Sequence, residues 1–203
     1  MKKVTVIDYG AGNLMSVKNA LCHLGCEVDF CDDPADLKKA KNLILPGVGA
    51  FKAAADNLFS RGFAKEISEY ISSGGNFLGI CLGLQLLFEK SEESPGAKGL
   101  GIFLGDVRRF PGDMGLKVPQ IGWNSLDIKK NDGIFGGITP GAFVYFVHSY
   151  YLTLSDSSLC AARCNYGIDF DAAIEKENAA AVQFHPEKSG ETGLLILENF
   201  LKK

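Results

Sequence analysis

The chain has 203 residues, of which 46% are hydrophobic and 22% charged, a composition typical of an ordinary globular protein. Its net charge of −3, with no run rich in lysine or arginine, argues against nucleic acid or an anionic membrane as the main partner. No apolar stretch reaches the ~18 residues of a transmembrane helix. Asp8 interrupts the first apolar run too early for a signal peptide, so we expect a cytoplasmic protein.

The first half of the chain alternates strand-like and helix-like segments. Apolar residues recur with helical spacing after Asn13, and Gly25 is the expected C-cap of that helix. Pro46-Gly47 is expected to end the third strand. The expected strands are Val4–Asp8, Glu27–Phe30, Asn42–Leu45 and Asn76–Ile80, and the expected helices are Asn13–Leu24, Ala50–Phe59, Phe63–Ile71 and Leu82–Phe88. This alternation predicts an α/β fold whose mostly parallel central sheet is covered on both faces.

The second half, from Gly99 to Phe184, contains short strand-like runs separated by Gly, Pro, Asn and Asp. Examples are Ile102–Leu104, Phe143–Val147 and Ala179–Phe184. These runs predict antiparallel additions to the sheet edge or a small second sheet. Residues Gly193–Phe200 have helical spacing and are expected to pack back on the sheet. Because no linker or repeat interrupts the chain, residues 1–203 are expected to form one domain.

The six cysteines are expected to be reduced thiols. The length, the large hydrophobic fraction and the missing signal favour the reducing cytoplasm over a disulfide framework. Cys22 and Cys26 form one C-x3-C pair, and Cys160 and Cys164 form another. Metal sites more often use two or four intervening residues, so no metal site is predicted. Cys22 and Cys26 straddle a helix end and are expected to pack as small apolar groups.

Residues Gly79-Ile80-Cys81-Leu82-Gly83 form a G-x-C-x-G sequence between a predicted strand and a predicted helix. This is the pattern of a nucleophile elbow with cysteine in place of serine. The glycines allow neighbouring chain to approach closely, and the helix N-terminus favours the thiolate form of Cys81. The N–H of Leu82 is expected to face an oxyanion formed beside the sulfur. A buried cysteine in an ordinary turn would not need both glycines and both flanking elements.

A thiolate mechanism needs a general base within hydrogen-bond reach, and the chain offers His23, His148 and His185. His23 lies near a helix end and is expected at the surface. His185 is followed by Pro186, which holds the chain extended, so that Glu187 is expected on the same side as His185. Glu187 could then bind one imidazole nitrogen and leave the other facing the cysteine. Without Cys81, an exposed turn would be the better interpretation of this His-Pro-Glu sequence.

Two glycine-rich turns follow predicted strands. Leu45–Phe51 reads L-P-G-V-G-A-F, and its backbone N–H groups could supply a second oxyanion donor. The alternative is a plain strand-to-helix turn. Asp8–Asn13 suggests a phosphate loop, but the third glycine of G-x-G-x-x-G is replaced by Met15 and no Walker lysine follows, so a nucleotide site is rejected.

In their order along the chain, P-G-V-G-A-F, G-I-C-L-G and Q-F-H-P-E-K-S-G resemble the class I glutamine amidotransferases. The resemblance covers essentially the whole chain and is strongest to the glutaminase subunits of imidazole glycerol phosphate synthases. The segments that point to this branch are D-Y-G-A-G-N-L at Asp8–Leu14, V-P-Q-I-G-W-N at Val118–Asn124, and Tyr145–Tyr150. Many members have histidine where this chain has Gln120. The resemblance implies a flavodoxin-like three-layer fold with a mostly parallel sheet and antiparallel additions in the C-terminal half.

The resemblance also implies roles for residues that the motifs alone do not assign. Val48 and Gly49, with Leu82, would form the oxyanion hole, and the peptide at Val48 would reorient on activation. The glutamine-binding residues would be Gly47, Gln85, Glu93, Ser149 and Tyr150. The residues near a partner subunit would be Asn13, Tyr145 and Lys188.

The implied reaction converts glutamine to glutamate and ammonia, without a metal or organic cofactor. The Cys81 thiolate attacks the carboxamide, His185 protonates the departing ammonia and then activates water, and Glu187 orients His185. By the resemblance, ammonia passes to a (β/α)8-barrel cyclase in a heterodimer. There it reacts with a phosphoribulosyl-formimino carboxamide ribotide to give imidazole glycerol phosphate and aminoimidazole carboxamide ribotide, in histidine biosynthesis.

The need for a synthase partner has a chemical reason. The amidotransferase fold takes up the 203 residues, which leaves no domain that could use ammonia. Free ammonia is mostly protonated at neutral pH and would not be nucleophilic. We therefore expect a separate chain that receives ammonia directly, and low glutaminase activity until that chain and its ligand bind.

Three other functions compete with this interpretation. A sister amidotransferase could serve another synthase, such as one that forms amidine sugars for surface polysaccharides or one that makes pyridoxal phosphate. A cysteine peptidase or peptidase-like stress protein on a similar fold would not need Pro46–Gly49 and Gln85 in these places. A binding protein that has lost catalysis is disfavoured by the complete set of Cys81, His185 and Glu187.

Overall fold

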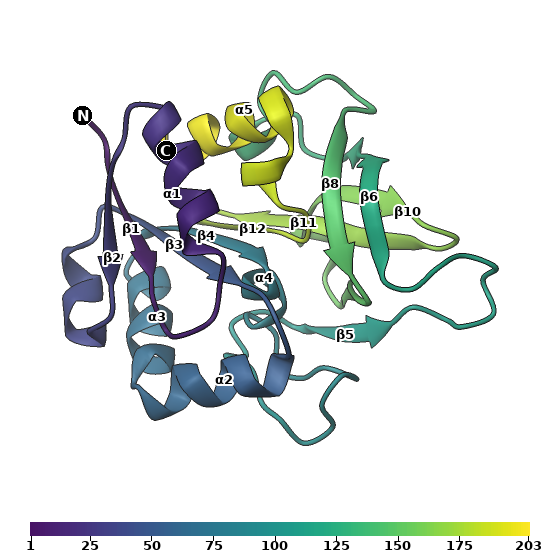
Figure 1. Cartoon of the computed structure of the whole chain (residues 1–203), viewed down its shortest axis with the longest axis horizontal. Helices are drawn as coiled ribbons and strands as arrows, with labels where there is room; N and C mark the ends of the chain where they lie inside the picture. The colour runs from purple at the N-terminus through teal and green to yellow at the C-terminus, as the bar shows by residue number, and fades with distance from the viewer.

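The computed structural model describes residues 1–203, in which helices cover both faces of a ten-stranded sheet (Figure 1). The strands are β1 (Lys3–Ile7), β2 (Glu27–Cys31), β3 (Asn42–Gly47), β4 (Asn76–Cys81), β5 (Gly105–Arg109), β6 (Gln120–Ser125), β7 (Asp127–Ile128), β8 (Phe143–His148), β9 (Tyr150–Leu154), β10 (Cys160–Asn165), β11 (Asp169–Lys176) and β12 (Ala179–Val182). The α-helices are α1 (Leu14–His23), α2 (Phe51–Ser60), α3 (Phe63–Ser72), α4 (Leu82–Gln85) and α5 (Gly190–Phe200). Four 3-10 helices are η1 (Pro34–Lys39), η2 (Gly133–Phe135), η3 (Ser157–Leu159) and η4 (Pro186–Lys188).

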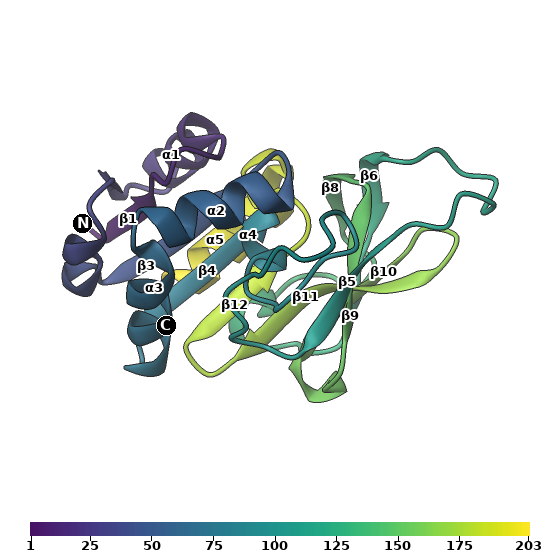
Figure 2. The same ribbon diagram turned by 90° about the horizontal axis from the view of Figure 1, so that it is seen from below.

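The main sheet has the order β2-β1-β3-β4-β12-β11-β10-β7, and its first five strands are parallel. The remaining pairings, including those of β5 and β9, are antiparallel. Strands β6 and β8 form a separate two-stranded sheet. Figure 2 shows these later strands gathered at the end of the molecule opposite α1 and α3. The sequence predicted edge additions or a second sheet, and the structure contains both.

The parallel strands are buried on both faces, as their nearly continuous apolar sequences require. One core cluster joins Ile44 of β3 to α1 and α5, whereas the other joins Leu43 and Leu45 to α2 and α3. Alternate residues of the strand therefore point to opposite helical layers. No helix has the length and apolar character needed to cross a membrane.

The first helix has the ends that its sequence predicts. The side chain of Asn13 accepts a hydrogen bond from the N–H of Ser16, which caps the N-terminus. At the other end, Gly25 has φ 76°. The N–H of Gly25 donates to the carbonyl of Cys22, and the N–H of Cys26 donates to the carbonyl of Leu21. These two bonds form a Schellman motif, which only a residue tolerant of positive φ completes without strain.

Cys22 is exposed although Cys26 is buried, so the prediction that both pack as apolar groups is wrong for Cys22. Cys22 lies in the last turn of α1 on its solvent side, whereas Cys26 follows the helix and joins the core. All six cysteines are free thiols.

The helix predicted over Leu82–Phe88 ends at Gln85. Beyond it the chain turns through tighter i→i+3 bonds, and Phe88 forms an isolated parallel bridge with Phe103. The whole apolar run is buried. Its apolar sequence therefore indicates that the segment lies in the core, and it does not indicate where the helix ends. The strand predicted at Ile102–Leu104 is likewise reduced to that bridge, and β5 begins at Gly105.

Pro46-Gly47 does not end the third strand, because β3 continues through both residues. The pairing of β3 with β1 stops at Ile44, whereas its pairing with β4 continues to Gly47. Pro46 therefore lies where β3 has a partner on one side only, a position at which a missing N–H costs the sheet little.

Candidate active site

Cys81 ends β4 directly before α4, and its backbone has φ 56° and ψ −111°. A positive φ is rare for a residue with a side chain and costs of order 1–3 kcal/mol, which the surrounding packing must impose. Gly83 permits that packing, because a Cβ added there would lie 2.0 Å from the carbonyl oxygen of Leu45 in β3. The strained turn predicted for an elbow is therefore present, held against the neighbouring strand.

Gly47 brings the end of β3 against the same turn. A Cβ added to Gly47 would lie 2.8 Å from the Cβ of Leu82 and 2.9 Å from the backbone nitrogen of Gly83. The chain then leaves β3 through Val48 and Gly49, and Gly49 has φ 92°. Val48 and Gly49 thus lie beside the first residues of α4, whose N–H groups have no partner within the helix.

His185 reaches Cys81 because β12 pairs with β4. Val182 lies opposite Ile80 in this parallel pair, so both strands end at the same edge of the sheet. The N–H of His185 donates to the carbonyl of Tyr145 in β8 (2.9 Å), and the hydroxyl of Ser189 donates to the carbonyl of His185 (2.6 Å). These bonds fix the backbone of the histidine on both sides.

Glu187 contacts His185 through a turn and not through an extended strand. Residues Pro186–Lys188 form η4, because the φ of proline suits the first position of a helical turn as well as an extended chain. The predicted geometry is therefore wrong, although the side chains meet: Nδ1 of His185 lies 2.8 Å from Oε1 of Glu187. The other nitrogen of the ring, Nε2, is left for Cys81.

The His185 ring favours the charged form. Burial opposes its charge, but hydrogen bonds to Cys81 and Glu187 outweigh burial and raise the pKa of His185 to about 10. The Glu187 side chain is only 1% exposed, so its charge acts on the imidazolium through little intervening water. At neutral pH the arrangement therefore favours an imidazolium beside the sulfur of Cys81.

A cavity of ≈ 160 Å³ lies against Cys81 and Leu82. It is also lined by Val48, Gly49, Gln85, Glu93, His148, Ser149 and Tyr150. The structure thus brings together the predicted oxyanion residues and every predicted glutamine-binding residue except Gly47, which packs beneath the elbow. Oε2 of Glu93 accepts a hydrogen bond from the N–H of Phe51 (2.8 Å), at the N-terminus of α2.

The three residues predicted at a partner surface lie on elements that pack together. Asn13 precedes α1, Tyr145 lies in β8, and Lys188 lies in η4, which contacts both α1 and β8. Lys188 is exposed, and the Tyr145 ring packs edge-on against Trp123 with 6.0 Å between centroids.

Three residues that sequence reasoning did not assign also shape the site: Gln183, His148 and Ser189. Gln183 and Ser189 flank the His-Pro-Glu sequence, a position that could have drawn attention to them. His148 cannot act as the base, because Nδ1 lies 2.8 Å from the Tyr150 carbonyl and Nε2 lies 3.0 Å from Oε1 of Gln120. Both ring nitrogens of His148 are therefore occupied within the chain.

His148 makes the fold sensitive to acid. Burial lowers the pKa of His148 to about 4 from 6.5, with a smaller effect from the charge of His185. As the pH falls below 6.5 the unfolded chain takes up this proton first, so stability is lost between pH 6.5 and pH 4. The effect of His185 on stability has the opposite sign. The stability that His185 contributes is fully present below pH 6.5 and is lost as the pH rises through 10.

We expect the free energy of unfolding to fall by about 2 kcal/mol between pH 7 and pH 5 through His148 alone. In His148→Asn, whose amide can still donate to the Tyr150 carbonyl, this loss should be absent. Urea unfolding of both proteins at the two pH values measures the difference. Equal losses in the two proteins would contradict the prediction.

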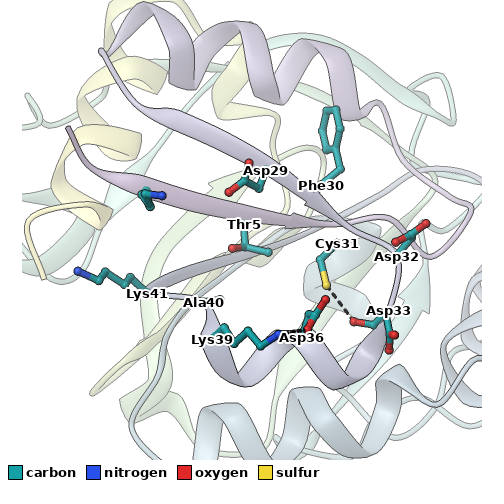
Figure 3. A pocket seen from close by; sticks show the side chains of 11 residues that line it. Thr5, Asp29, Phe30, Cys31, Asp32, Asp33, Asp36, Lys39, Ala40 and Lys41 are labelled. Carbon is teal, nitrogen blue, oxygen red and sulfur yellow. Dashed lines mark hydrogen bonds and ion pairs between the residues drawn. The ribbon is translucent and has the colours of Figure 1, made fainter.

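A second cavity, of ≈ 330 Å³, lies beside the edge strand β2, away from Cys81 (Figure 3). The Cys31 thiol donates to the carbonyl of Asp33 (3.0 Å), and Lys39 pairs with Asp36 (2.5 Å). Its lining mixes aspartate and lysine side chains and contains no residue predicted for catalysis.

Comparison with known proteins gives consistent matches over the whole chain. Residues 5–203 match the family described as Glutamine amidotransferase class-I. The chain is 50% identical over 202 residues to imidazole glycerol phosphate synthase subunit HisH of Syntrophotalea carbinolica, covering 97% of this chain and 98% of that protein. It is 49% identical over 200 residues to the chloroplastic imidazole glycerol phosphate synthase hisHF of Arabidopsis thaliana, covering 98% of this chain and 34% of that longer protein.

Solved structures share the fold at much lower identity. A crystal structure described as glutamine amidotransferase has a TM-score of 0.76 at 22% identity, covering 97% of this chain and 98% of that one. The structure of PurLQS from Thermotoga maritima has a TM-score of 0.75 at 21% identity, covering 99% of this chain and 98% of that one. The predicted α/β fold, with its mostly parallel sheet and antiparallel additions, is confirmed.

Proposed function

This chain belongs to the class-I glutamine amidotransferase family, and we propose that it hydrolyses the side-chain amide of glutamine through a thioester on Cys81. One observation carries the assignment of the site: a strained elbow cysteine meets the buried His185–Glu187 pair beside a small cavity. The elements that form this site come from separate parts of the sequence, so their convergence is not a local accident of one turn.

The Cys81 thiolate attacks the amide carbon of glutamine. The N–H of Leu82 and the peptides of Val48 and Gly49 stabilise the tetrahedral oxyanion, for which one such donor contributes roughly 3 kcal/mol. His185 protonates the departing ammonia, which leaves a glutamyl thioester. The neutral ring then takes a proton from water, the resulting hydroxide opens the thioester, and glutamate leaves with the thiolate restored.

The lining of the cavity suits the two ends of free glutamine. Glu93 is its one acidic residue, and its second carboxylate oxygen is available to the α-ammonium group of the substrate. Gln85 offers an amide to the substrate, and Ser149 and Tyr150 also line the cavity. Gly47 allows the elbow and the end of β3 to approach without a side chain between them.

The chain is the glutaminase subunit of an imidazole glycerol phosphate synthase and acts in histidine biosynthesis. It works with a partner subunit. The partner is a (β/α)8-barrel cyclase in a heterodimer, and it uses the ammonia to make imidazole glycerol phosphate and aminoimidazole carboxamide ribotide. The Arabidopsis relative supports this pairing, because this chain matches only 34% of that synthase. The six free thiols fit the reducing cytoplasm.

An exposed apolar face on the β6–β8 sheet supports a partner surface. Ile121, Trp123 and Phe143 are each more than half exposed, and they share the outer face of this two-stranded sheet with Tyr145. Apolar side chains gathered in this way mark interaction sites on soluble proteins. Cys81 lies just beneath the same sheet, with its sulfur 4.0 Å from the Val147 carbonyl, so a partner bound there would cover the site.

The test is glutamate release measured for the chain alone, with a cyclase subunit, and with that subunit and its ribotide ligand. We expect low activity alone and an increase of at least about tenfold with the ligand-bound partner. High activity in the isolated chain, unchanged by the partner, would refute dependence on a synthase. Rescue of a histidine auxotroph that lacks this subunit separates the assignment from a sister amidotransferase that serves another synthase.

A further inference from the structure

We propose that Gln183 is a further functional residue of this site, whose buried amide links Gln85 to the sulfur of Cys81 and holds both in their reactive orientation. The inference rests on the proposed glutamine hydrolysis, which gives Cys81 its role. Gln183 directly follows β12 and has no exposed surface. Its Nε2 lies 3.8 Å from Sγ of Cys81, and its Oε1 lies 3.0 Å from Nε2 of Gln85.

The orientation of both amides follows from one carbonyl group. The backbone oxygen of Tyr150 can only accept hydrogen bonds, so the group that contacts it at 3.1 Å must be the NH2 of Gln85. The second hydrogen of that NH2 then meets Oε1 of Gln183. The NH2 of Gln183 is consequently the group that faces the sulfur, and a reversed amide would place two acceptors in contact.

This arrangement assigns the remaining atoms of both side chains. Gln85 uses its NH2 within the chain, so its Oε1 is the atom available to accept an N–H from a ligand in the cavity. Gln183 donates to the sulfur, and a donor stabilises a thiolate more than a thiol. His185 supplies positive charge to the same sulfur, whereas Gln183 supplies a neutral donor that fixes where the sulfur lies.

The same carbonyl group also accepts from His148. Nδ1 of His148 contacts the Tyr150 oxygen at 2.8 Å, and Nε2 contacts Gln120. The Tyr150 carbonyl is thereby held by two buried side chains, His148 and Gln85. An unpaired amide in such a place would cost roughly 1–3 kcal/mol, so Gln85 and Gln183 each depend on the partners that hold their amides.

Two substitutions of nearly equal size test the donor. Gln183→Glu keeps an acceptor for Gln85 but places a carboxylate beside the sulfur, and Gln183→Met removes the amide without adding charge. Both are studied as the full chain with Cys22→Ser, because Cys22 is the exposed thiol that would otherwise react. The rate of iodoacetamide alkylation of Cys81, followed by mass spectrometry across pH 5–10, gives the midpoint at which the sulfur becomes reactive.

We expect the midpoint to rise by about one pH unit or more in Gln183→Glu and by less in Gln183→Met. With the partner subunit and its ligand present, kcat for glutamine should fall at least about tenfold in both variants. The factor by which KM rises should be smaller than the factor by which kcat falls. Gln120→Met is the matched control, because it removes a buried amide that does not touch the sulfur. Its midpoint should equal that of the parent.

An unchanged alkylation midpoint in folded Gln183→Glu and Gln183→Met would overturn the proposal, as would an equal shift in Gln120→Met. If Gln183→Glu fails to unfold cooperatively in urea, Gln183→Met alone decides between these outcomes. Alkylation requires no glutamine, so this test stands even if glutamine is not the substrate. The two proposals can therefore fail separately.

Discussion

Cys81→Ala should reduce glutamine hydrolysis by a factor of about 10⁴ or more, to the background of the assay. The covalent step has no substitute, because Cys81 is the one cysteine among the residues that line the cavity, and a thiolate is a far stronger nucleophile than a hydroxyl group. The fold should survive, since the variant loses one small buried atom and keeps the elbow glycines. Glutamate release in the presence of the partner and its ligand is the measurement.

Two controls make this loss specific. Cys22→Ala removes the exposed thiol of α1 and should leave hydrolysis unchanged. When an ammonium salt at alkaline pH replaces glutamine, the complex that contains Cys81→Ala should still form the cyclised product, because Cys81, His185 and Glu187 serve only to supply ammonia. Residual glutamine hydrolysis above roughly one per cent of the parent would contradict a thioester mechanism.

Gly83→Ala should destabilise the protein by roughly 3 kcal/mol or more and abolish activity. The added Cβ would lie 2.0 Å from the backbone oxygen of Leu45, and neither α4 nor β3 can move aside alone because both are buried. Relief requires β3 to separate from the elbow, which also displaces Val48 and Gly49 beyond the end of β3. Urea unfolding and glutamate release test the two parts of the prediction.

Gly112→Ala is the matched control for this substitution. Gly112 has no neighbour within 4 Å of an added Cβ and does not require a positive φ. The same chemical change there should alter the free energy of unfolding by less than about 1 kcal/mol. A Gly83→Ala protein as stable as this control would show that the close approach at the elbow is not required.

The sequence was sufficient for the features that local chemistry determines. The elbow could be predicted because two glycines, a buried strand and a cysteine occupy consecutive positions, and their packing explains each of them. The His185–Glu187 contact could be predicted, but its geometry could not. Proline is compatible with both an extended chain and the start of a helical turn, and only the surrounding contacts select between them.

Features that depend on distant pairing could not be predicted in detail. Ala179–Val182 reads as one short strand among several, yet β12 lies at the centre of the sheet next to β4. The position of Glu93 at the α2 N-terminus depends on a long loop between α4 and β5, which has no periodic pattern. The helix predicted to Phe88 was shortened by tertiary contacts, because a buried apolar run satisfies more than one backbone conformation.

The parallel pairing of β12 with β4 also affects when the site can form during synthesis and folding of the chain. Cys81 is synthesised about a hundred residues before His185, and Val182 must insert beside Ile80 before these two residues can meet. Pairing over such a separation is slow, because the loop between the strands must close first. An incomplete chain on the ribosome can therefore carry a finished elbow and remain inert. Cys81 meets His185 only when β12 has paired with β4, so we expect glutaminase activity only from chains in which this last strand is in place.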